Sequence, residues 1–307
     1  MSERSPLLSE AEELGSFLAE LENGTEVKEI AGLESGFPGL SRALNGILPG
    51  LHLLIGRPSC GKTAFAKQFA DQVASHNSIP AMFFSFTESK KDLRIRTLAR
   101  LSGLESREIM RGSSYLLHWY GVPKANLSDP GRLPLGWERV KSVVELANSW
   151  LALVYLFEGG EKTDLNEIAG CVRKVEEIKG SKQAMVVIDD SQRLGATDLS
   201  IDSRLPLVTE QLQGLAVDLQ VPVLATWPDL RRERAGSTPQ EWAEKVAGAE
   251  AVLVMEEDAE RTKKLTEPNR AINLHIVKNR GGEKGTLAFD FFPAFSRFAE
   301  VASILTF

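Results

Sequence analysis

The eight residues from Gly56 to Thr63 carry the most specific chemistry in this sequence. They read Gly-Arg-Pro-Ser-Cys-Gly-Lys-Thr, a complete G-x-x-x-x-G-K-[ST] phosphate-binding loop. The two glycines let the backbone curl around phosphate oxygens, and the N–H groups that open the following helix supply positive potential. Lys62 would reach the β- and γ-phosphates of ATP, and the Thr63 hydroxyl would ligate Mg²⁺. We therefore expect an ATP site built from Gly56, Arg57, Pro58, Ser59, Cys60, Gly61, Lys62, Thr63 and Ala64.

Acidic residues after two apolar runs would complete an ATPase site. The run 184–188 ends in Asp189 and Asp190, as expected for a Walker-B strand whose first carboxylate holds Mg²⁺. The alternative for Asp189 is a turn-capping role after a core strand. Glu88 follows the run 81–86 and is the candidate general base that orients the attacking water. It would equally suit the N-terminus of a helix over 91–101, where a negative charge is favoured.

A pair of cations precedes a glycine turn near the C-terminal end. Lys278 and Arg280 lie in the segment Val277-Lys278-Asn279-Arg280-Gly281-Gly282, at the end of an expected strand. A positive tip of this kind could meet a γ-phosphate across a subunit boundary. Taken alone, the segment would be an ordinary solvated turn.

An α/β sheet is needed to bring these residues together. Apolar runs predict strands over 51–55, 81–86, 151–156, 184–188, 221–225, 251–255 and 272–277. Helical patterns fall between them, over 64–75, 91–101, 137–148 and 165–179. This alternation indicates a mainly parallel, twisted sheet flanked by helices on both faces. Residues 286–291 and 296–301 predict a C-terminal β-hairpin.

The chain divides into a short leader and one large domain. We expect a disordered start over 1–8, an acidic linker helix and connector over 9–35, and the ATPase domain over 36–307. A loop insertion rich in proline, glycine and aromatic residues is expected near 113–136. Its aromatic residues, Tyr115, Trp119 and Tyr120, would either hold the loop down or stack on a base or partner.

Composition limits the class of protein. The 307 residues are 43% hydrophobic and 25% charged, which is ordinary for a globular protein, and the net charge is −6. That charge argues against an obvious basic surface for nucleic acid, but it leaves room for a basic channel formed by several subunits. No apolar run is long enough to span a membrane and the start lacks a signal core, so we expect a cytoplasmic protein.

The two cysteines, Cys60 and Cys171, are too few for a disulfide framework or a zinc site. Cys60 lies inside the phosphate loop, where it is either a redox-sensitive thiol or a small side chain at an unread position. We favour the second interpretation.

Four segments, in order, resemble the ATPase domain of DnaB-type replicative helicases, in the RecA-like superfamily. They read EIAGLESGFPGLSRALNGILPGLHLLIGRPSCGKTAFAKQFA, AMFFSFTESKKDLRIRTLARLSGLESREIMRG, QAMVVIDDSQRL and VKNRGGEKGTLAFDFFPAFSRF. The resemblance covers roughly Ile30 to Ala299, without the amino-terminal domain of full-length members. It implies ATP and Mg²⁺ as ligands, a homo-oligomer (a ring or filament, such as a hexamer) and single-stranded DNA as a partner. The acidic stretch 9–23 falls where the family has the linker helix that docks on the next subunit.

The resemblance also assigns roles to individual residues. It implies that Lys62 and Thr63 bind phosphate and Mg²⁺ and that Asp189 takes the Walker-B role. Lys278 and Arg280 match the basic residues that act in trans on a neighbour's γ-phosphate. A further match, Phe295, falls where an aromatic ring packs near the nucleotide base.

Several positions depart from the family pattern. The usual catalytic glutamate position holds Thr87, and Glu88 lies one residue on, as in the paired glutamates of KaiC-like relatives. Asp190 replaces the tyrosine that usually follows the Walker-B aspartate, and Trp227-Pro228 stands where the family has a Ser-Gln sensor.

The family's DNA-gripping loop is also altered. It reads Pro239-Gln240-Glu241-Trp242-Ala243, with Gln240 at the arginine position and Ala243 at the glycine position. Losing a phosphate contact in each subunit would weaken DNA binding. A basic cluster at Arg231, Arg232 and Arg234 would either contact DNA or lie in a solvated loop.

Three functions fit these features. The first is a DnaB-like ATPase that acts on single-stranded DNA as an oligomer. The alternative is a non-translocating, KaiC-like ATP-dependent switch or scaffold that acts on a protein partner, with weak or no DNA coupling. The third is a pseudo-enzyme that binds ATP without hydrolysing it. Stimulation of ATP turnover by single-stranded DNA separates the first from the second, and absence of turnover identifies the third.

Overall fold

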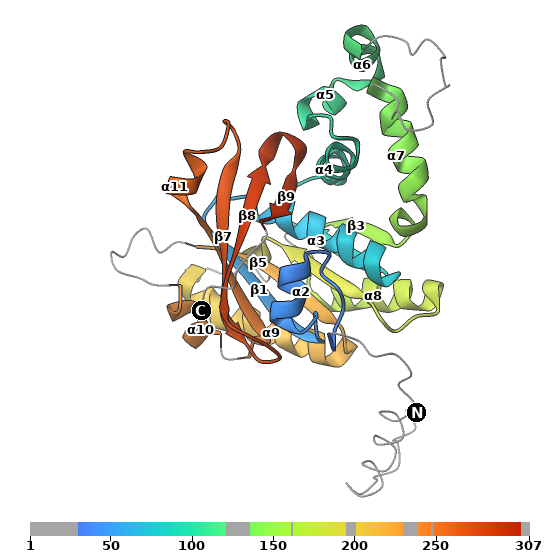
Figure 1. Cartoon of the computed structure of the whole chain (residues 1–307). Helices are drawn as coiled ribbons and strands as arrows, with labels where there is room; N and C mark the ends of the chain where they lie inside the picture. Colours follow the sequence, from blue (N-terminus) through green and yellow to red (C-terminus); the bar gives the residue numbers. More distant parts are fainter. Residues whose placement is uncertain are drawn as a thin grey trace, which may run out of the picture.

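The computed structural model describes residues 30–120, 136–160, 162–194, 201–229, 239–246 and 248–301. A nine-stranded sheet in the order β3-β2-β4-β5-β1-β6-β7-β8-β9 forms its centre (Figure 1). Neighbouring strands from β3 to β6 pair in parallel, and β7, β8 and β9 pair antiparallel at one edge. The mainly parallel sheet and the C-terminal hairpin predicted from the sequence are therefore confirmed.

The strands of the parallel part follow the apolar runs closely. They are β1 (Gly50–Gly56), β2 (Ala81–Ser85), β3 (Val154–Glu158), β4 (Met185–Asp189), β5 (Pro222–Pro228) and β6 (Ala251–Glu257). The antiparallel strands are β7 (Arg270–Asn279), β8 (Gly285–Phe292) and β9 (Arg297–Glu300). The strand expected over 151–156 begins later, because the preceding helix continues to Leu151.

Helices cover both faces of the sheet. The helices of the described residues are α2 (Pro38–Leu44), α3 (Lys62–Asn77), α4 (Lys90–Ser102), α5 (Ser106–Met110), α6 (Gly112–Tyr120), α7 (Gly136–Leu151), α8 (Leu165–Lys179), α9 (Ile201–Leu219), α10 (Glu241–Lys245) and α11 (Ala259–Thr262). Short 3-10 turns occur at η1 (Ser191–Arg193) and η3 (Pro293–Phe295).

Two large apolar cores lie on the two faces. Side chains alternate along a strand, so on β1 Leu54 packs with α2 and α3 while Leu53 and Ile55 pack with α8 and α9. Phe65 on α3 joins the first core through stacked and edge-on contacts with the rings of other phenylalanines. The double coverage explains why the central strands read as nearly continuous apolar runs.

A small helical unit projects beyond the sheet (Figure 1). It comprises α4 to α7 and has its own core, which includes Ile95, Leu116 and Val140. The loop predicted near 113–136 is wrong at its start, because Gly112–Tyr120 is helix α6 and Gly136 opens α7. In α6, the Tyr115 ring lies 4.6 Å from the Arg111 guanidinium and packs against the small core, which favours a structural role for this aromatic.

Some predicted features fall outside the described residues. These are the disordered start over 1–8, the acidic helix over 9–23, most of the connector to residue 35, and the basic cluster at Arg231, Arg232 and Arg234. Within the described ranges, we find no helix with the length and apolar character that a membrane crossing requires.

Candidate active site

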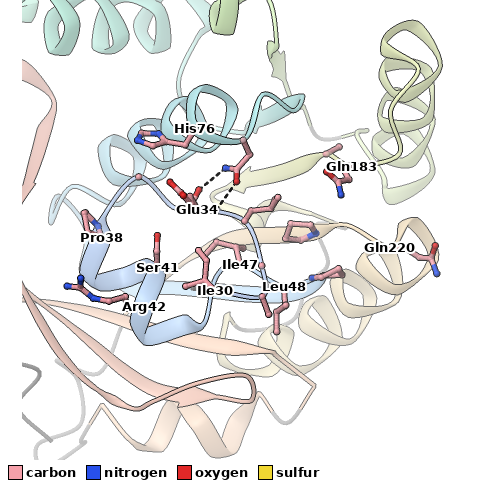
Figure 2. Close-up of a pocket in the computed structure, with 18 residues that line it drawn as sticks. Ile30, Glu34, Pro38, Ser41, Arg42, Ile47, Leu48, His76, Gln183 and Gln220 are labelled. Carbon is pink, nitrogen blue, oxygen red and sulfur yellow. Dashed lines mark hydrogen bonds between the residues drawn. The ribbon is translucent and has the colours of Figure 1, made fainter. Parts of the chain in front are cut away.

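Two cavities lie at opposite ends of the parallel strands. The larger, about 770 Å³, is at the amino ends, between the segment that follows Ile30, the end of α3 and the starts of β4 and β5 (Figure 2). Asn77 exchanges two hydrogen bonds with the backbone of Glu34 beside it. The smaller, about 430 Å³, is at the carboxyl ends, where open α/β sheets bind their ligands. It is lined by Ser59, Gly61, Lys62, Thr63, Ala64, Thr87, Glu88, Arg96, Asp189, Asp190, Thr226, Arg270, Phe291 and Pro293.

The phosphate loop connects β1 to α3 at this smaller cavity. Gly61 has a φ of +100°, and a Cβ there would lie 2.9 Å from the rings of Phe291 and Phe298, so only glycine fits. Lys62 begins α3, and its Nζ donates to the carbonyl oxygens of Gly56 at 2.7 Å and Arg57 at 3.0 Å. The loop backbone and the ammonium group therefore line one rim of the cavity.

The thiol of Cys60 is turned into the protein. Burial raises its pKa above the ordinary value, while the charge of Lys62 lowers it to a smaller extent. Because the thiolate is the reactive form, a raised pKa argues against a redox-sensitive thiol and favours a space-filling role.

Asp189 ends β4 and receives hydrogen bonds from two threonines. Thr63 Oγ1 donates to its Oδ2 at 2.8 Å, and Thr226 Oγ1 donates to its Oδ1 at 2.8 Å. The side chain is buried, and burial raises its pKa to about 6, while both hydrogen bonds act in the opposite direction and the charges of Glu88 and Asp190 raise it further. A buried carboxylate without enough positive charge nearby suits a divalent cation.

The oxygens of Thr63 and Asp189 fit Mg²⁺. They are hard ligands, and they meet at the point where the loop would present phosphate oxygens. Among the described residues, no group of three or more His, Cys, Asp or Glu side chains could hold a metal ion. The two-ligand arrangement is the kind that Mg²⁺ uses when substrate phosphates and water complete its coordination.

Glu88 lies between the end of β2 and the start of α4. Its backbone N–H donates to Ser85 Oγ at 2.9 Å, and its two carboxylate oxygens accept hydrogen bonds from Arg96. The N-cap of α4 is Ser89, whose hydroxyl already accepts from the backbone N–H of Asp92. The helix start is therefore capped without Glu88, which weakens the purely structural alternative for this residue.

Asp190 lines the same cavity, but its carboxylate is paired with Arg193. It has a left-handed backbone with a φ of 65°, and its Oδ2 accepts from Arg193 Nε at 2.7 Å. Its backbone N–H donates to Thr226 Oγ1 at 2.7 Å. Asp190 thus helps to hold Thr226, whose hydroxyl bridges the ends of β4 and β5.

The rim nearest the C-terminal hairpin contains a cation and an aromatic ring. Arg270 Nη1 donates to the Ser59 carbonyl at 2.9 Å, and its guanidinium lies 5.8 Å from the centre of the Phe291 ring. Phe295, expected beside the nucleotide base, ends η3 and is not among the residues that line the cavity. Phe291, near the end of β8, and Pro293, at the start of η3, line it instead.

Lys278 and Arg280 lie at the opposite end of the strands from the cavity. β7 runs antiparallel to β6, so its first residue, Arg270, is at the phosphate loop while Lys278 pairs with Val252 near the start of β6. An extended strand of this length covers roughly 30 Å. The two cations contact residues before β6: Lys278 Nζ donates to the Val246 carbonyl at 2.9 Å, and Arg280 Nε lies 3.6 Å from a Glu250 oxygen. The fold separates them from the cavity of their own chain.

The family's sensor position is packed into the protein, whereas the segment of its DNA loop holds a buried tryptophan beside the exposed Gln240. Trp227 and Pro228 belong to β5, and Trp227 is buried in the core. Trp242, in α10, is also buried in that core, and Lys245 Nζ lies 5.1 Å from the centre of its ring. Gln240 precedes this helix. A buried tryptophan anchors the segment Pro239–Ala243 at its centre.

Sequence reasoning missed five residues of the cavity: Arg96, Thr226, Arg270, Phe291 and Pro293. Thr226 has a local signal, because it is a polar residue near the carboxyl end of an apolar strand. The other four lie at the cavity through tertiary contacts between segments far apart in the chain.

Comparison with known proteins identifies the family. The family model described as "DnaB-like helicase C terminal domain" matches residues 32–300. The chain belongs to this family. The predicted resemblance to a DnaB-type P-loop ATPase is thereby confirmed at the level of the family.

The curated relatives that match this chain are described as replicative DNA helicases. A replicative DNA helicase DnaB of Leifsonia xyli subsp. xyli is 27% identical over 286 residues, covering 90% of this chain and 57% of the relative. A replicative DNA helicase DnaC of Bacillus subtilis is 25% identical over 284 residues, covering 89% of this chain and 57% of the relative. The chain thus spans little more than half the length of these DnaB-like relatives.

Solved structures share the fold. One solved ATPase domain superposes with a TM-score of 0.72 at 21% identity, covering 96% of this chain and 100% of that domain. A DnaB-like replicative helicase, described together with its interactions with primase, gives a TM-score of 0.71 at 21% identity, covering 94% of this chain and 68% of that one. These matches confirm the RecA-like, DnaB-type fold.

Proposed function

We propose that this chain hydrolyses ATP with Mg²⁺ and acts, as a homo-oligomer, on single-stranded DNA. The observation that carries the proposal is the meeting of Thr63, Asp189 and Glu88 in one cavity beside the phosphate loop. Family membership supports the same activity.

The residues of the cavity divide the work of phosphoryl transfer. Backbone N–H groups of the loop and the ammonium group of Lys62 hold the phosphates. The positive end of the α3 helix dipole, at the start of the helix, adds to this attraction. Thr63 and Asp189 would hold Mg²⁺, which would neutralise charge on the phosphate oxygens. Glu88 accepts a hydrogen bond from the attacking water and aligns it with the γ-phosphate. Thr226 keeps the Asp189 carboxylate in place through its hydrogen bond.

A second subunit would complete the site. Lys278 and Arg280 lie at the end of the strands opposite their own cavity. They can therefore meet a γ-phosphate only in another copy of the chain. We therefore include a head-to-tail homo-oligomer, a ring or a filament, in the proposal. The acidic cluster of Glu88, Asp189 and Asp190 in one subunit complements these cations in the next.

The test is Mg²⁺-dependent ATP hydrolysis. Wild-type protein should release phosphate with Mg²⁺ and lose this activity in EDTA. Thr63→Val, which removes the hydroxyl at nearly constant volume, should reduce turnover strongly. Turnover that is unchanged in EDTA and in Thr63→Val would contradict the assignment of this cavity.

A non-translocating switch or scaffold is the second candidate. Two observations favour it: β5 ends in Trp227-Pro228 at the family's sensor position, and Trp242 anchors the segment 239–243 in the core. Proline has no N–H to donate to a phosphate-sensing network. If single-stranded DNA raises ATP turnover at low salt, the motor function stands. ATP turnover that is indifferent to DNA would favour the switch.

A further inference from the structure

Arg96 makes the closest polar contacts of Glu88. Its Nε donates to Glu88 Oε2 at 2.7 Å, and its Nη2 forms an ion pair with Oε1. Both atoms of the guanidinium edge therefore face both carboxylate oxygens, the bidentate geometry that fixes a carboxylate most firmly. Glu88 lies just before α4 and Arg96 lies within it, so one short segment of the chain carries the clamp.

The same guanidinium contacts the C-terminal hairpin. Arg96 Nη1 donates to Ser296 Oγ at 3.0 Å. Ser296 is buried and has a φ of 47°, and its backbone N–H bonds to the Pro293 carbonyl, which closes the turn between β8 and β9. Pro293 lines the cavity. Arg96 thus links Glu88, on one side of the cavity, to the β8–β9 turn on the other side.

We propose that Arg96 is a positioning residue that fixes the Glu88 carboxylate at the site of water attack and ties it to the β8–β9 turn at Ser296. The inference rests on the proposed function, because it assumes that Glu88 orients water for ATP hydrolysis. It adds a role that the motifs do not assign to this arginine.

The geometry leaves Glu88 able to act. A carboxylate has about four lone-pair sites, and a bidentate arginine uses one on each oxygen. The remaining sites can accept a hydrogen bond from water. A free glutamate side chain would distribute itself among rotamers, whereas a clamped one is held in a single orientation before substrate binds. Arg96 therefore favours hydrolysis by pre-ordering the base.

Charge in the cavity favours the same arrangement. Burial would lower the pKa of Arg96, but its hydrogen bond to Glu88 and the charges of Glu88 and Asp189 raise it above the ordinary value. The guanidinium therefore stays charged, and it offsets part of the repulsion between Glu88 and the Asp189 carboxylate. Without it, two carboxylates would repel each other at the metal site and Glu88 would turn away.

The test compares Arg96→Ala with Arg94→Ala. Arg94 is exposed on the same helix and does not line the cavity, so it is a matched control. Arg96→Ala should lower kcat for ATP about 10- to 100-fold, as expected when a catalytic group is misplaced, with KM changed less than about threefold. Arg96→Lys keeps the charge but not the bidentate contact, so kcat should fall by an intermediate factor. Arg94→Ala should behave like wild type.

The decisive readout is the same substitution in a Glu88→Gln background. If Arg96 acts through Glu88, Arg96→Ala should change the residual single-turnover rate of Glu88→Gln by less than about twofold. If Arg96→Ala lowers turnover by the same factor in both backgrounds, Arg96 acts on the fold or on the nucleotide and the inference is overturned. If Arg96→Ala raises turnover, Arg96 restrains Glu88 from acting, and the inference is overturned as well. If Arg96→Ala does not fold, Arg96→Lys in the two backgrounds gives the same comparison.

The tie to the hairpin has its own variant. Ser296→Gly removes the hydroxyl and suits the left-handed backbone, so the turn should persist. We expect a fall in kcat smaller than that of Arg96→Ala, and an unchanged kcat would overturn the tie. The outcomes separate this inference from the proposed function. If Glu88→Gln leaves wild-type turnover intact, the base assignment has failed; if only Glu88→Gln is impaired, the role of Arg96 has failed.

Discussion

Thr63 Oγ1 lies 2.8 Å from Asp189 Oδ2, which joins the first turn of α3 to the end of β4 at one buried carboxylate. The two residues are 126 positions apart in the sequence. Their hydrogen bond brings the start of α3, after the phosphate loop, to the end of β4, where we propose that Mg²⁺ binds.

Asp189→Asn should separate stability from activity. Because burial raises the pKa of Asp189 to about 6, the ionised side chain is disfavoured in the fold at neutral pH, and a neutral side chain removes that cost. The asparagine amide nitrogen only donates, so the Thr63 hydroxyl, which now donates to Oδ2, would accept from it instead. We expect a melting temperature in EDTA equal to or above that of wild type, together with loss of Mg²⁺-dependent ATP turnover. Differential scanning calorimetry and phosphate release measure the two effects. A variant that melts well below wild type, or that still hydrolyses ATP, would contradict the assignment.

Thr226→Val tests the hydroxyl that bridges β4 and β5. The substitution removes the donor to Asp189 Oδ1 and the acceptor for the Asp190 N–H. Both buried partners would then be unsatisfied, at a cost of about 1–3 kcal/mol each, and Asp189 would lose its orientation. We expect lower thermal stability and a higher Mg²⁺ requirement for turnover. Thr262→Val, in α11 outside the cavity, is a control whose turnover should match wild type.

A buried charge cluster between α3 and α4 should carry much of the stability of the fold. Asp71 pairs with Lys67 and Arg100 and accepts a hydrogen bond from Thr97. Asp71→Asn leaves two buried cations without their carboxylate, so the free energy of unfolding should fall by about 3–5 kcal/mol. Glu260→Ala, in the exposed pair Glu260–Lys263, should change it by less than about 1 kcal/mol. Urea titrations compare the two, and equal effects would refute the assignment.

The same cluster predicts a dependence on acid. Burial alone would raise the pKa of Asp71, but the charges of Lys67 and Arg100 hold it below the ordinary value of 3.8. A carboxyl whose pKa is lowered by folding contributes stability that is fully present above its unfolded pKa and lost as pH falls through the folded one. Wild type should therefore lose stability more steeply than Asp71→Asn below about pH 4. Parallel slopes in acid titrations would contradict this.

Arg280→Ala should impair hydrolysis in a neighbouring subunit. The variant should bind ATP normally, because Arg280 lies at the far edge of the sheet, yet turn over slowly in the oligomer. Mixed with Lys62→Ala chains, it should regain activity, since some interfaces then combine an intact phosphate loop with an intact Arg280. Phosphate release from the mixture measures this, and a mixture no more active than its parts would rule out action in trans.

The sequence predicts best what is local. The phosphate loop, Asp189 and the parallel strands are contiguous patterns, and each fell within a few residues of its observed place. The boundary between α7 and β3 was missed because the apolar run 151–156 lacks a turn signal.

Residues that meet across the fold could not be predicted from local patterns. Arg96 reaches Ser296, 200 positions away, and Arg270 reaches Ser59, 211 positions away. Neither contact has a sequence pattern, because each depends on how β7, β8 and α4 pack around the loop. The resemblance predicts Phe295 beside the nucleotide base, whereas Phe291 lines the cavity, because the pairing of β8 with β7 brings Phe291 beside Arg270 at the phosphate loop.

The most direct test of ATP hydrolysis at this site is steady-state phosphate release by wild type, Lys62→Ala and Lys91→Ala. Lys91 is exposed on α4 and does not line the cavity, which makes it a control for the loss of one lysine. We expect Mg²⁺-dependent turnover in wild type and Lys91→Ala and none in Lys62→Ala. Wild-type-like turnover in Lys62→Ala, or no turnover in any of the three, would contradict ATP hydrolysis in this cavity.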